Sequence, residues 1–502
     1  MDERSNCETL ACMSTVISAH RLADLLGDFD RTPAYRGLAR AIALLVGEGR
    51  IATDTRLPGE RDLALVLSVS RTTVTRAYLD LRDAGFATAR QGSGHYTRLP
   101  GGRARVLDRA LTPRTPTGDG TGIEGDEAPI DLTCAASSAP AGLAEAYQRA
   151  AEALPPYLSG QGYYPTGLPE LQAAIADTYA ERGLATRPEQ IMVTPGALAA
   201  VAIVAQTLTR AGERVMVEAP VYPNATQALR HRGARLVAAD VDPDHWDLNL
   251  ISSILRRDSP RLAYLIPDFQ NPTGLLMDER QRADYAALLA RHRTTALVDE
   301  AHQGLALDDQ VMPAPFASFA RDAITVGSAS KSVWGGLRLG WIRVPDQATF
   351  DAVMAARVSL DLGAPVMEQL VLLSILRDPH LRATITEKNR ERLREQRDAL
   401  VTAISERLPD WEFRVPGGGL ALWCRLPRPV ALELAVEAER HGVLIPPGPL
   451  FSVQGGLRGF VRLPWIRPAE ELRAAVDGLA DAWECVQNNA ETDRTSRRVL
   501  IA

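Results

Sequence analysis

Lysine is almost absent from this chain of 502 residues. Of its 56 lysine and arginine residues, only Lys331 and Lys388 are lysines. Arginine stays protonated and is a poor nucleophile, whereas a desolvated lysine amine can lose its proton and condense with a carbonyl group. Ser328, Ser330 and Arg338 lie close to Lys331 and have side chains that bind phosphate. This segment predicts a lysine that holds pyridoxal phosphate (PLP) as a Schiff base; the alternative is a chance surface lysine, as we take Lys388 to be.

Three further side chains could serve the ring of PLP. Asp299 follows the apolar run 296–298, at the carboxyl end of a predicted strand, where a carboxylate could keep the pyridine nitrogen protonated. Asn271 could hydrogen-bond the ring hydroxyl, and Tyr222 could stack on the ring face. Each has a structural alternative: a helix cap for Asp299, an ordinary Asn-Pro-x-Gly turn for Asn271 and a core aromatic for Tyr222. The spacing of 32 residues between Asp299 and Lys331 favours the cofactor role.

A second phosphate-binding element is predicted where the apolar run 191–193 meets segment 194–198. Gly196 and Ala197 lie at this junction, at the expected start of a helix. The N-terminus of a helix offers free backbone N–H groups and a favourable dipole to an anion. We expect this helix to complete the phosphate site together with the side chains near Lys331.

The overall composition is that of a globular protein with more than one domain. A length of 502 residues predicts at least two domains, and an apolar content of 46% is ample for large cores. The net charge of −6 says nothing strong about partners. The five cysteines lack metal-binding and redox spacing, which predicts reduced thiols and no metal site: Cys7, Cys12, Cys134, Cys424 and Cys485. A polar start unlike a signal peptide, and apolar stretches too short for a bilayer, predict a cytoplasmic protein that begins at Met1 or Met13.

The chain divides into segments of different character. Residues 14–98 contain short helical patterns that end in a glycine-rich hairpin. Residues 99–128 are rich in Pro, Gly, Thr and charge, which predicts a flexible linker. From 129 to 487, helices alternate with short β-branched runs, which predicts an α/β domain with a mostly parallel sheet between helices. The polar tail 488–502 is expected to be disordered.

Segment 55–81 has the pattern of a helix–turn–helix. Ser70 is a suitable N-cap for the second helix, whose apolar side chains share one face. The other face presents residues suited to base edges and phosphates in a major groove, namely Arg71, Thr72, Thr73 and Arg76. The following segment 85–96 indicates a two-stranded wing, with Gly92 at a tip whose bare backbone could approach a phosphate.

The charge of this region supports DNA as its partner. Residues 55–98 contain seven arginines against four acidic residues, a local excess of +3 in a chain that is acidic overall. The alternative is a set of helices that serves as a protein-interaction module.

The same region resembles the winged helix of GntR-type bacterial repressors over about 65 residues from Tyr35. The resemblance rests on Leu-Pro-x-Glu-Arg-x-Leu-Ala, Val-Ser-Arg-Thr-Thr-Val and a slightly altered Arg-x-Gly-Ser-Gly. Gly59 departs from the family, which often has a capping serine there. The resemblance implies DNA contacts from Arg61 as well as from the residues on the second helix and the wing, so the expected DNA-binding set is Arg61, Arg71, Thr72, Thr73, Arg76 and Gly92.

The region after the linker resembles fold type I aminotransferases over roughly 350 residues. This resemblance implies a smaller C-terminal α/β subdomain, a Tyr163 that reaches the cofactor of a dimer partner, and an Arg462 that grips a substrate carboxylate. A strand-edge surface charge is the alternative for Arg462. Ala197 stands where a hydroxyl commonly helps to bind phosphate, and His302 replaces a tyrosine that tunes the ring hydroxyl, so efficient transamination is not assumed.

A winged helix, a linker and an aminotransferase-like body, in this order, resemble the MocR subfamily of GntR regulators. The resemblance implies a transcription factor that binds double-stranded DNA, carries PLP, senses PLP or an amino compound, and forms a homodimer with domains exchanged head to tail. Any aminotransferase activity would be vestigial. Two alternatives remain: a working aminotransferase with an appended DNA-binding domain, and a DNA-binding protein whose body no longer binds PLP.

Overall fold

The computed structural model describes residues 16–47, 50–51, 55–90, 94–98, 100, 129–241 and 245–498. The chain divides into two compact units, residues 1–107 and 108–502. Gly92, Met13 and, apart from Pro100, the linker expected at 99–128 lie outside the described residues. Among the helices that the structure describes, none combines the length and apolar character needed to cross a membrane.

The first unit is built from four helices and a two-stranded antiparallel sheet. Its elements are α1 (Ala19–Leu26), α2 (Ala34–Gly47), α3 (Glu60–Val66), α4 (Arg71–Asp83), β1 (Ala87–Arg90) and β2 (Gly94–Thr97). The apolar faces of the helices meet in one core that includes Leu22, Ile42, Leu63 and Val74. Helices α3 and α4 form the helix–turn–helix predicted from the sequence, and β1 pairs with β2 as the wing.

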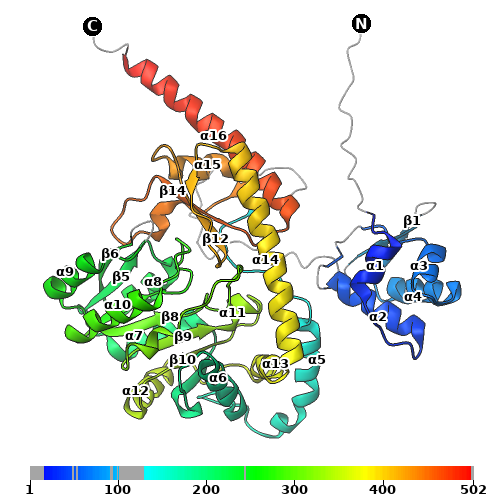
Figure 1. The fold of residues 1–502 in the computed structure, drawn as a ribbon, viewed down its shortest axis with the longest axis horizontal. Coiled ribbons are helices and arrows are strands. Elements are labelled where there is room, and N and C mark those ends of the chain that lie inside the picture. The colour runs from blue at the N-terminus through cyan, green and yellow to red at the C-terminus, as the bar shows by residue number, and fades with distance from the viewer. Residues whose placement is uncertain are drawn as a thin grey trace. The chain divides into compact units, whose positions relative to one another are not determined.

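The second unit is organised around a seven-stranded sheet with strand order β4-β10-β9-β8-β7-β5-β6 (Figure 1). The strands are β4 (Ile191–Thr194), β5 (Arg214–Ala219), β6 (Arg235–Asp240), β7 (Leu262–Leu265), β8 (Thr295–Asp299), β9 (Ile324–Ser328) and β10 (Gly340–Arg343). Only β10 runs against the others, since it pairs antiparallel with both β4 and β9. The mostly parallel sheet predicted from the alternating pattern is therefore confirmed.

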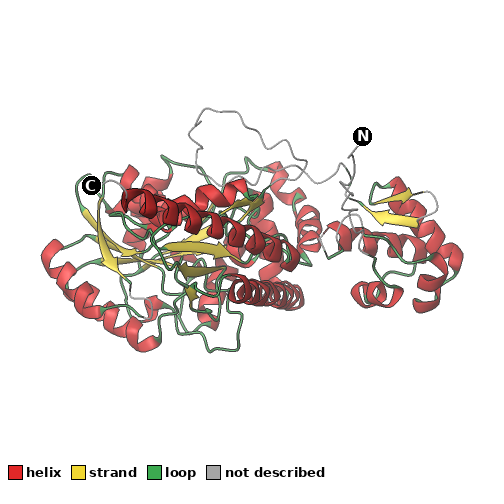
Figure 2. Ribbon diagram, turned by 90° about the horizontal axis from the view of Figure 1, so that it is seen from above, coloured by secondary structure: helices red, strands yellow, loops and turns green. Residues whose placement is uncertain are grey.

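Helices cover both faces of this sheet (Figure 2). Alternate side chains of a strand point to opposite faces, so Val215 and Val217 of β5 enter one core while Met216 enters another. The first core is closed by α7 (Ala197–Leu208), α8 (Pro223–His231) and α12 (Gln347–Arg357). The second is closed by α9 (Leu248–Asp258) and α10 (Glu279–Arg291). Buried on both faces, the strands have the continuous apolar sequences of a parallel sheet.

A further layer of helices packs beside β4 and β10. It consists of α5 (Leu143–Ala153), α6 (Pro169–Glu181), α13 (Val366–Arg377) and the first part of α14 (Pro379–Arg407), which share one apolar core. The short helix α11 (Ala329–Ser332) follows β9 directly and contributes Ala329 to this core.

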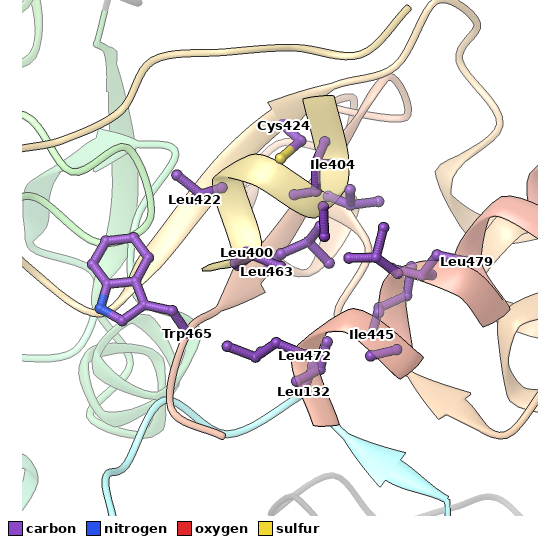
Figure 3. Packing of buried hydrophobic residues seen from close by; sticks show 14 of the residues in the cluster. Leu132, Leu400, Ile404, Leu422, Cys424, Ile445, Leu463, Trp465, Leu472 and Leu479 are labelled. Atoms are coloured by element: carbon purple, nitrogen blue, oxygen red, sulfur yellow. The ribbon is translucent and has the colours of Figure 1, made fainter. Parts of the chain in front are cut away.

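The C-terminal part of α14 leads into a smaller α/β subdomain with its own core, in which Leu400, Leu463, Trp465 and Leu472 pack together (Figure 3). It contains the antiparallel sheet β11 (Glu412–Phe413), β12 (Ala421–Arg425) and β14 (Phe460–Pro464), the helices α15 (Ala431–Arg440) and α16 (Ala469–Arg498), and β13 (Val443–Leu444), which pairs with β3 (Ile130–Asp131). The pairing of β3 with β13 thereby joins the first strand of the second unit to its C-terminal subdomain.

The structure differs from the sequence prediction at the C-terminus. Residues 488–502 were expected to be disordered, but α16 continues to Arg498. The polar residues of this segment include no glycine and no proline. The segment therefore contains no residue that would end α16, and the helix continues through it.

Candidate functional site

The predicted cofactor residues follow the ends of five strands. Since β4, β5, β7, β8 and β9 all run in the same direction, their carboxyl ends lie at one edge of the sheet, where α/β proteins bind ligands. The residues that end or follow these strands are Gly196 after β4, Tyr222 after β5, Asn271 after β7, Asp299 in β8 and Ser328 in β9.

Asp299 is a buried carboxylate held by two donors. Its Oδ2 atom accepts a hydrogen bond of 2.6 Å from the Tyr264 hydroxyl, and its Oδ1 atom accepts one of 2.9 Å from the backbone N–H of Ala301. Burial raises the pKa of Asp299, while these hydrogen bonds and nearby Lys331 oppose the rise. Two donors fix the orientation of the carboxylate, as an ion-pair partner for a ring nitrogen requires. Tyr264 was missed because its place in an apolar strand gives no polar signal.

Lys331 lies on α11, directly after β9, and β9 is the neighbour in the sheet of β8, which ends in Asp299. Its Nζ atom donates a hydrogen bond of 2.6 Å to the backbone carbonyl of Ala135. Burial lowers the pKa of Lys331, with a smaller lowering from Arg462 and a rise from Asp299. A lowered pKa increases the fraction of neutral amine, which is the nucleophilic form. Lys388, by contrast, is an exposed residue of α14 and pairs with Glu391 at 2.7 Å.

The phosphate-binding elements converge from two sides. Gly196 has a φ of +101°, and a Cβ atom on it would lie 3.1 Å from Nη2 of Arg338. Gly196 is also the N-cap of α7, which has no side-chain cap, so the first N–H groups of that helix are not used by a capping side chain. The hydroxyl of Ser328 accepts from the N–H of Ser330 at 3.1 Å and keeps its own proton to donate. Ala197 has no hydroxyl, so it can offer a phosphate only its backbone N–H at the start of α7.

Ser330 contributes less to this cradle than the sequence suggested. Its hydroxyl donates to the carbonyl of Leu337 at 3.0 Å and so supports the turn that carries Arg338. The cradle of glycine, helix N-terminus, serine and arginine fits a phosphate group.

Arg462 joins the site from β14 of the smaller subdomain. It donates to the Oδ1 atom of Asn271 at 3.2 Å and to the carbonyl of Thr133 at 2.7 Å, and its guanidinium lies 4.9 Å from the centre of the Phe451 ring. Burial lowers the pKa of Arg462 to about 10. Its Nε atom is buried and has no hydrogen-bond partner. A buried arginine with an unused donor suits a carboxylate ligand. Because Arg462 is buried, it is not the surface charge at a strand edge that was the alternative interpretation.

His302 occupies a buried position beside the same site. Burial lowers the pKa of His302 to about 4, so the ring is neutral near pH 7. Its Nδ1 atom lies 2.9 Å from the carbonyl oxygen of Phe269, which can only accept a hydrogen bond. The proton is therefore assigned to Nδ1, which leaves Nε2 as an acceptor. A tyrosine at this position would offer a donor instead.

Two predicted aromatic residues have different surroundings. Tyr222 is half-buried at the start of α8, its hydroxyl accepts from Asn224 at 3.0 Å, and its pKa is raised chiefly by burial. Asp299 and Arg462 both lie near enough to Tyr222 to influence its pKa, which the aspartate raises and the arginine lowers. Tyr163, however, is 63% exposed on the loop before α6.

In the first unit, the predicted DNA-contact residues gather around the start of α4. Ser70 caps the helix by accepting from the N–H of Thr73 at 3.0 Å. Arg71 is exposed and pairs with Glu60 of α3 at 3.2 Å, and the guanidinium of Arg76 lies 4.1 Å from the centre of the Tyr35 ring. Arg61 and Thr72 are exposed, and Thr73 is half-buried. The start of α4 therefore presents two oriented arginines and a hydroxyl, as a recognition helix needs.

The fold and site define a PLP-binding body of the fold type I aminotransferase class behind a winged helix. Residues 143–479 match the family model for aminotransferase class I and II, and residues 34–96 match the model for bacterial regulatory proteins of the gntR family. The chain belongs to the aminotransferase class I and II family and carries a gntR-family domain ahead of it. This is the architecture of MocR-type GntR regulators, which confirms the sequence prediction.

Individual relatives include both regulators and enzymes. The chain is 25% identical to the HTH-type transcriptional regulator YisV of Bacillus subtilis, over 86% of this chain and 92% of YisV. It is 29% identical to the probable rhizopine catabolism regulatory protein MocR of Rhizobium meliloti, over 76% of this chain and 78% of MocR. The structure of LysN, an α-aminoadipate aminotransferase from Thermus thermophilus complexed with N-(5'-phosphopyridoxyl)-L-leucine, has a TM-score of 0.65 and 27% identity, over 72% of this chain and 93% of LysN.

Proposed function

We propose that the protein is a DNA-binding transcriptional regulator that uses its aminotransferase-like body to sense PLP itself or an amino compound. The observation that carries the proposal is the union in one chain of a capped recognition helix and a body in which Lys331, Asp299 and a phosphate cradle share one sheet edge. A regulator of this kind acts in the cytoplasm, where it meets double-stranded DNA.

Different residues of the body would bind different parts of PLP. Gly196, Ser328 and Arg338 would hold the phosphate, Asp299 would face the ring nitrogen, and Lys331 would bind the aldehyde carbon. Asn271 and Tyr222 would contact the hydroxyl and the face of the ring. Bound PLP supplies an aldehyde that condenses reversibly with primary amines. The neutral amine that Lys331 needs for this bond is favoured by the burial that lowers its pKa.

Arg462 would select among amino compounds. Its buried guanidinium has an unused Nε donor, and such a group binds a carboxylate far better than an uncharged substituent. A ligand with both an amine and a carboxylate could therefore compete with Lys331 for the cofactor while Arg462 holds its other end. Because Arg462 lies on the smaller subdomain and Lys331 on the large sheet, such a ligand would join the two and favour one arrangement of them.

We further infer that the working form is a head-to-tail homodimer. Tyr163 is a large exposed side chain on a glycine-flanked loop, suited to reach the cofactor of a partner chain. Two winged helices carried by such a dimer would bind two half-sites, and a change in the bodies would alter the spacing that the helices can span.

A second candidate function is that of a working aminotransferase with an accessory DNA-binding domain. It is favoured by the nearly complete set of cofactor side chains and by likeness to LysN. The neutral His302, which presents an acceptor where a tyrosine would donate, and Ala197, which lacks a hydroxyl, favour the regulator instead. Steady turnover of an amino donor with a keto acid would support the enzyme.

The test is a titration of the purified protein against its own promoter region, with and without PLP. The proposal predicts tight, salt-sensitive binding whose affinity or footprint changes when PLP is added. Salt-insensitive binding that ignores PLP, together with steady transamination, would favour the enzyme.

A further inference from the structure

Three potential metal ligands meet between the last two helices of the smaller subdomain. Glu437 lies on α15, His441 is the C-cap of that helix, and Cys485 lies on α16. One ligand atom from each of the three lies within 4.8 Å of the other two. Cysteine spacing along the sequence gave no indication of this cluster, because Cys485 is its only cysteine and its partners come from another helix.

The types of these residues favour zinc. A thiolate, an imidazole nitrogen and a carboxylate oxygen are all ligands of Zn²⁺, with metal–ligand distances of about 2.0 to 2.3 Å. In a tetrahedral site such ligands lie about 3.5 Å apart, so small side-chain rotations would bring this cluster to the required geometry. One thiolate and one carboxylate would also balance the charge of Zn²⁺.

The side chains are free to turn toward a metal. The Nδ1 atom of His441 is buried and has no hydrogen-bond partner, an arrangement that costs free energy unless something binds there. Cys485 is a free, half-buried thiol. Glu437 accepts from Arg440 at 2.8 Å through Oε2, and its Oε1 atom remains for a metal. All three residues are half-buried, so an ion can reach them.

We propose that Glu437, His441 and Cys485 form a zinc-binding site that joins α15 to α16, with water as the fourth ligand. On binding, Cys485 releases its proton to solvent and the metal takes up the thiolate. Cys485 belongs to α16, and this helix extends past the other elements of the second unit (Figure 1). The zinc would therefore fix the direction in which this helix leaves the subdomain.

The site is tested by titrating the metal-free, full-length protein with Co²⁺, which replaces Zn²⁺ and absorbs when bound to a thiolate. We expect one strongly bound Co²⁺ per chain with a thiolate charge-transfer band that Zn²⁺ displaces. Cys485→Ser should abolish the band, and His441→Ala and Glu437→Gln should each weaken binding by ~10- to 100-fold. Glu433→Gln is the matched control, because Glu433 lies one turn earlier on α15 and pairs with Arg458 at 2.6 Å.

Thermal melting separates loss of metal from loss of fold. Zinc should raise the melting temperature of the wild type and of Glu433→Gln, but not that of Cys485→Ser, while all metal-free forms melt alike. The proposal is overturned if no thiolate band forms, or if Cys485→Ser and His441→Ala bind Co²⁺ as tightly as the wild type. Neither outcome bears on PLP or DNA binding.

Discussion

At the scale of single residues, the site combines a familiar set of groups with one altered hydrogen bond. Lys331, Asp299 and Arg462 have the burial and partners that a PLP site with a carboxylate-binding arm requires. His302 differs, because its Nδ1 proton is committed to the Phe269 carbonyl and Nε2 can only accept. No donor from this residue would stabilise a negative charge on the ring hydroxyl.

Substituting His302→Tyr should therefore change the titration of the bound cofactor. A tyrosine hydroxyl can donate to the ring oxygen and stabilise its anion, so the apparent pKa of the visible absorption of bound PLP should fall by about one unit. A spectrophotometric pH titration measures this shift. His380→Tyr, at an exposed position on α14, is the control and should leave the titration unchanged. An unchanged or higher pKa in His302→Tyr would contradict the assigned proton.

The sequence singled out candidate site residues by their own residue type, and it could not single out residues whose contribution to the site depends on the fold. Lys331 stood out because lysine is so rare, and Asp299 because it ends an apolar strand. Tyr264 and the carbonyl of Ala135 also serve the site, as partners of Asp299 and Lys331, yet they carry no local signal. Their roles depend on strand order and on a segment close to Lys331 only in space.

At the scale of elements, the two helices of the DNA-binding motif differ in how their N-termini are capped. Helix α4 has Ser70 as a side-chain cap, while the N-cap residue of α3 is Gly59, which has no side chain to cap the helix. Ser70 directly precedes Arg71 and Thr72, so the order of the start of α4 decides how well those two side chains are presented. At the other end of the chain, α16 continues to Arg498, into the tail expected to be disordered, because composition alone cannot show whether a polar segment continues an existing helix.

Ser70→Ala should destabilise the first unit by ~1 kcal/mol, because the N–H of Thr73 loses its acceptor. Gly59→Ser should stabilise it by a few tenths of a kcal/mol, since serine caps somewhat better than glycine. Urea unfolding followed by circular dichroism measures both changes. Equal stability of Ser70→Ala and wild type would show that the cap does not hold α4.

At the scale of the whole molecule, the chain is two compact units, and the boundary between them at residues 107 and 108 falls within the segment 99–128 that was expected to be a linker. The fold class was predictable from the alternation of helices and strands. The smaller subdomain was predictable only through family resemblance, because its core joins β3 from the start of the second unit to helices from its end.

Limited digestion with trypsin should cut first within 99–128, which contains several arginines and the composition of a flexible linker. The larger fragment should keep the absorption of bound PLP and lose DNA binding. Mass spectrometry locates the cuts, and absorption spectra follow the cofactor. First cleavage inside the α/β body would contradict this division.

The central claim is that the bond between Lys331 and PLP controls DNA binding. The most direct measurement compares the affinity of wild type, Lys331→Ala and Lys388→Ala for a promoter duplex, with and without PLP at fixed salt. We expect PLP to change the affinity of wild type and Lys388→Ala by at least ~5-fold, within the usual range of allosteric coupling. Lys331→Ala should show no change. An equal response to PLP in Lys331→Ala and wild type would contradict the claim.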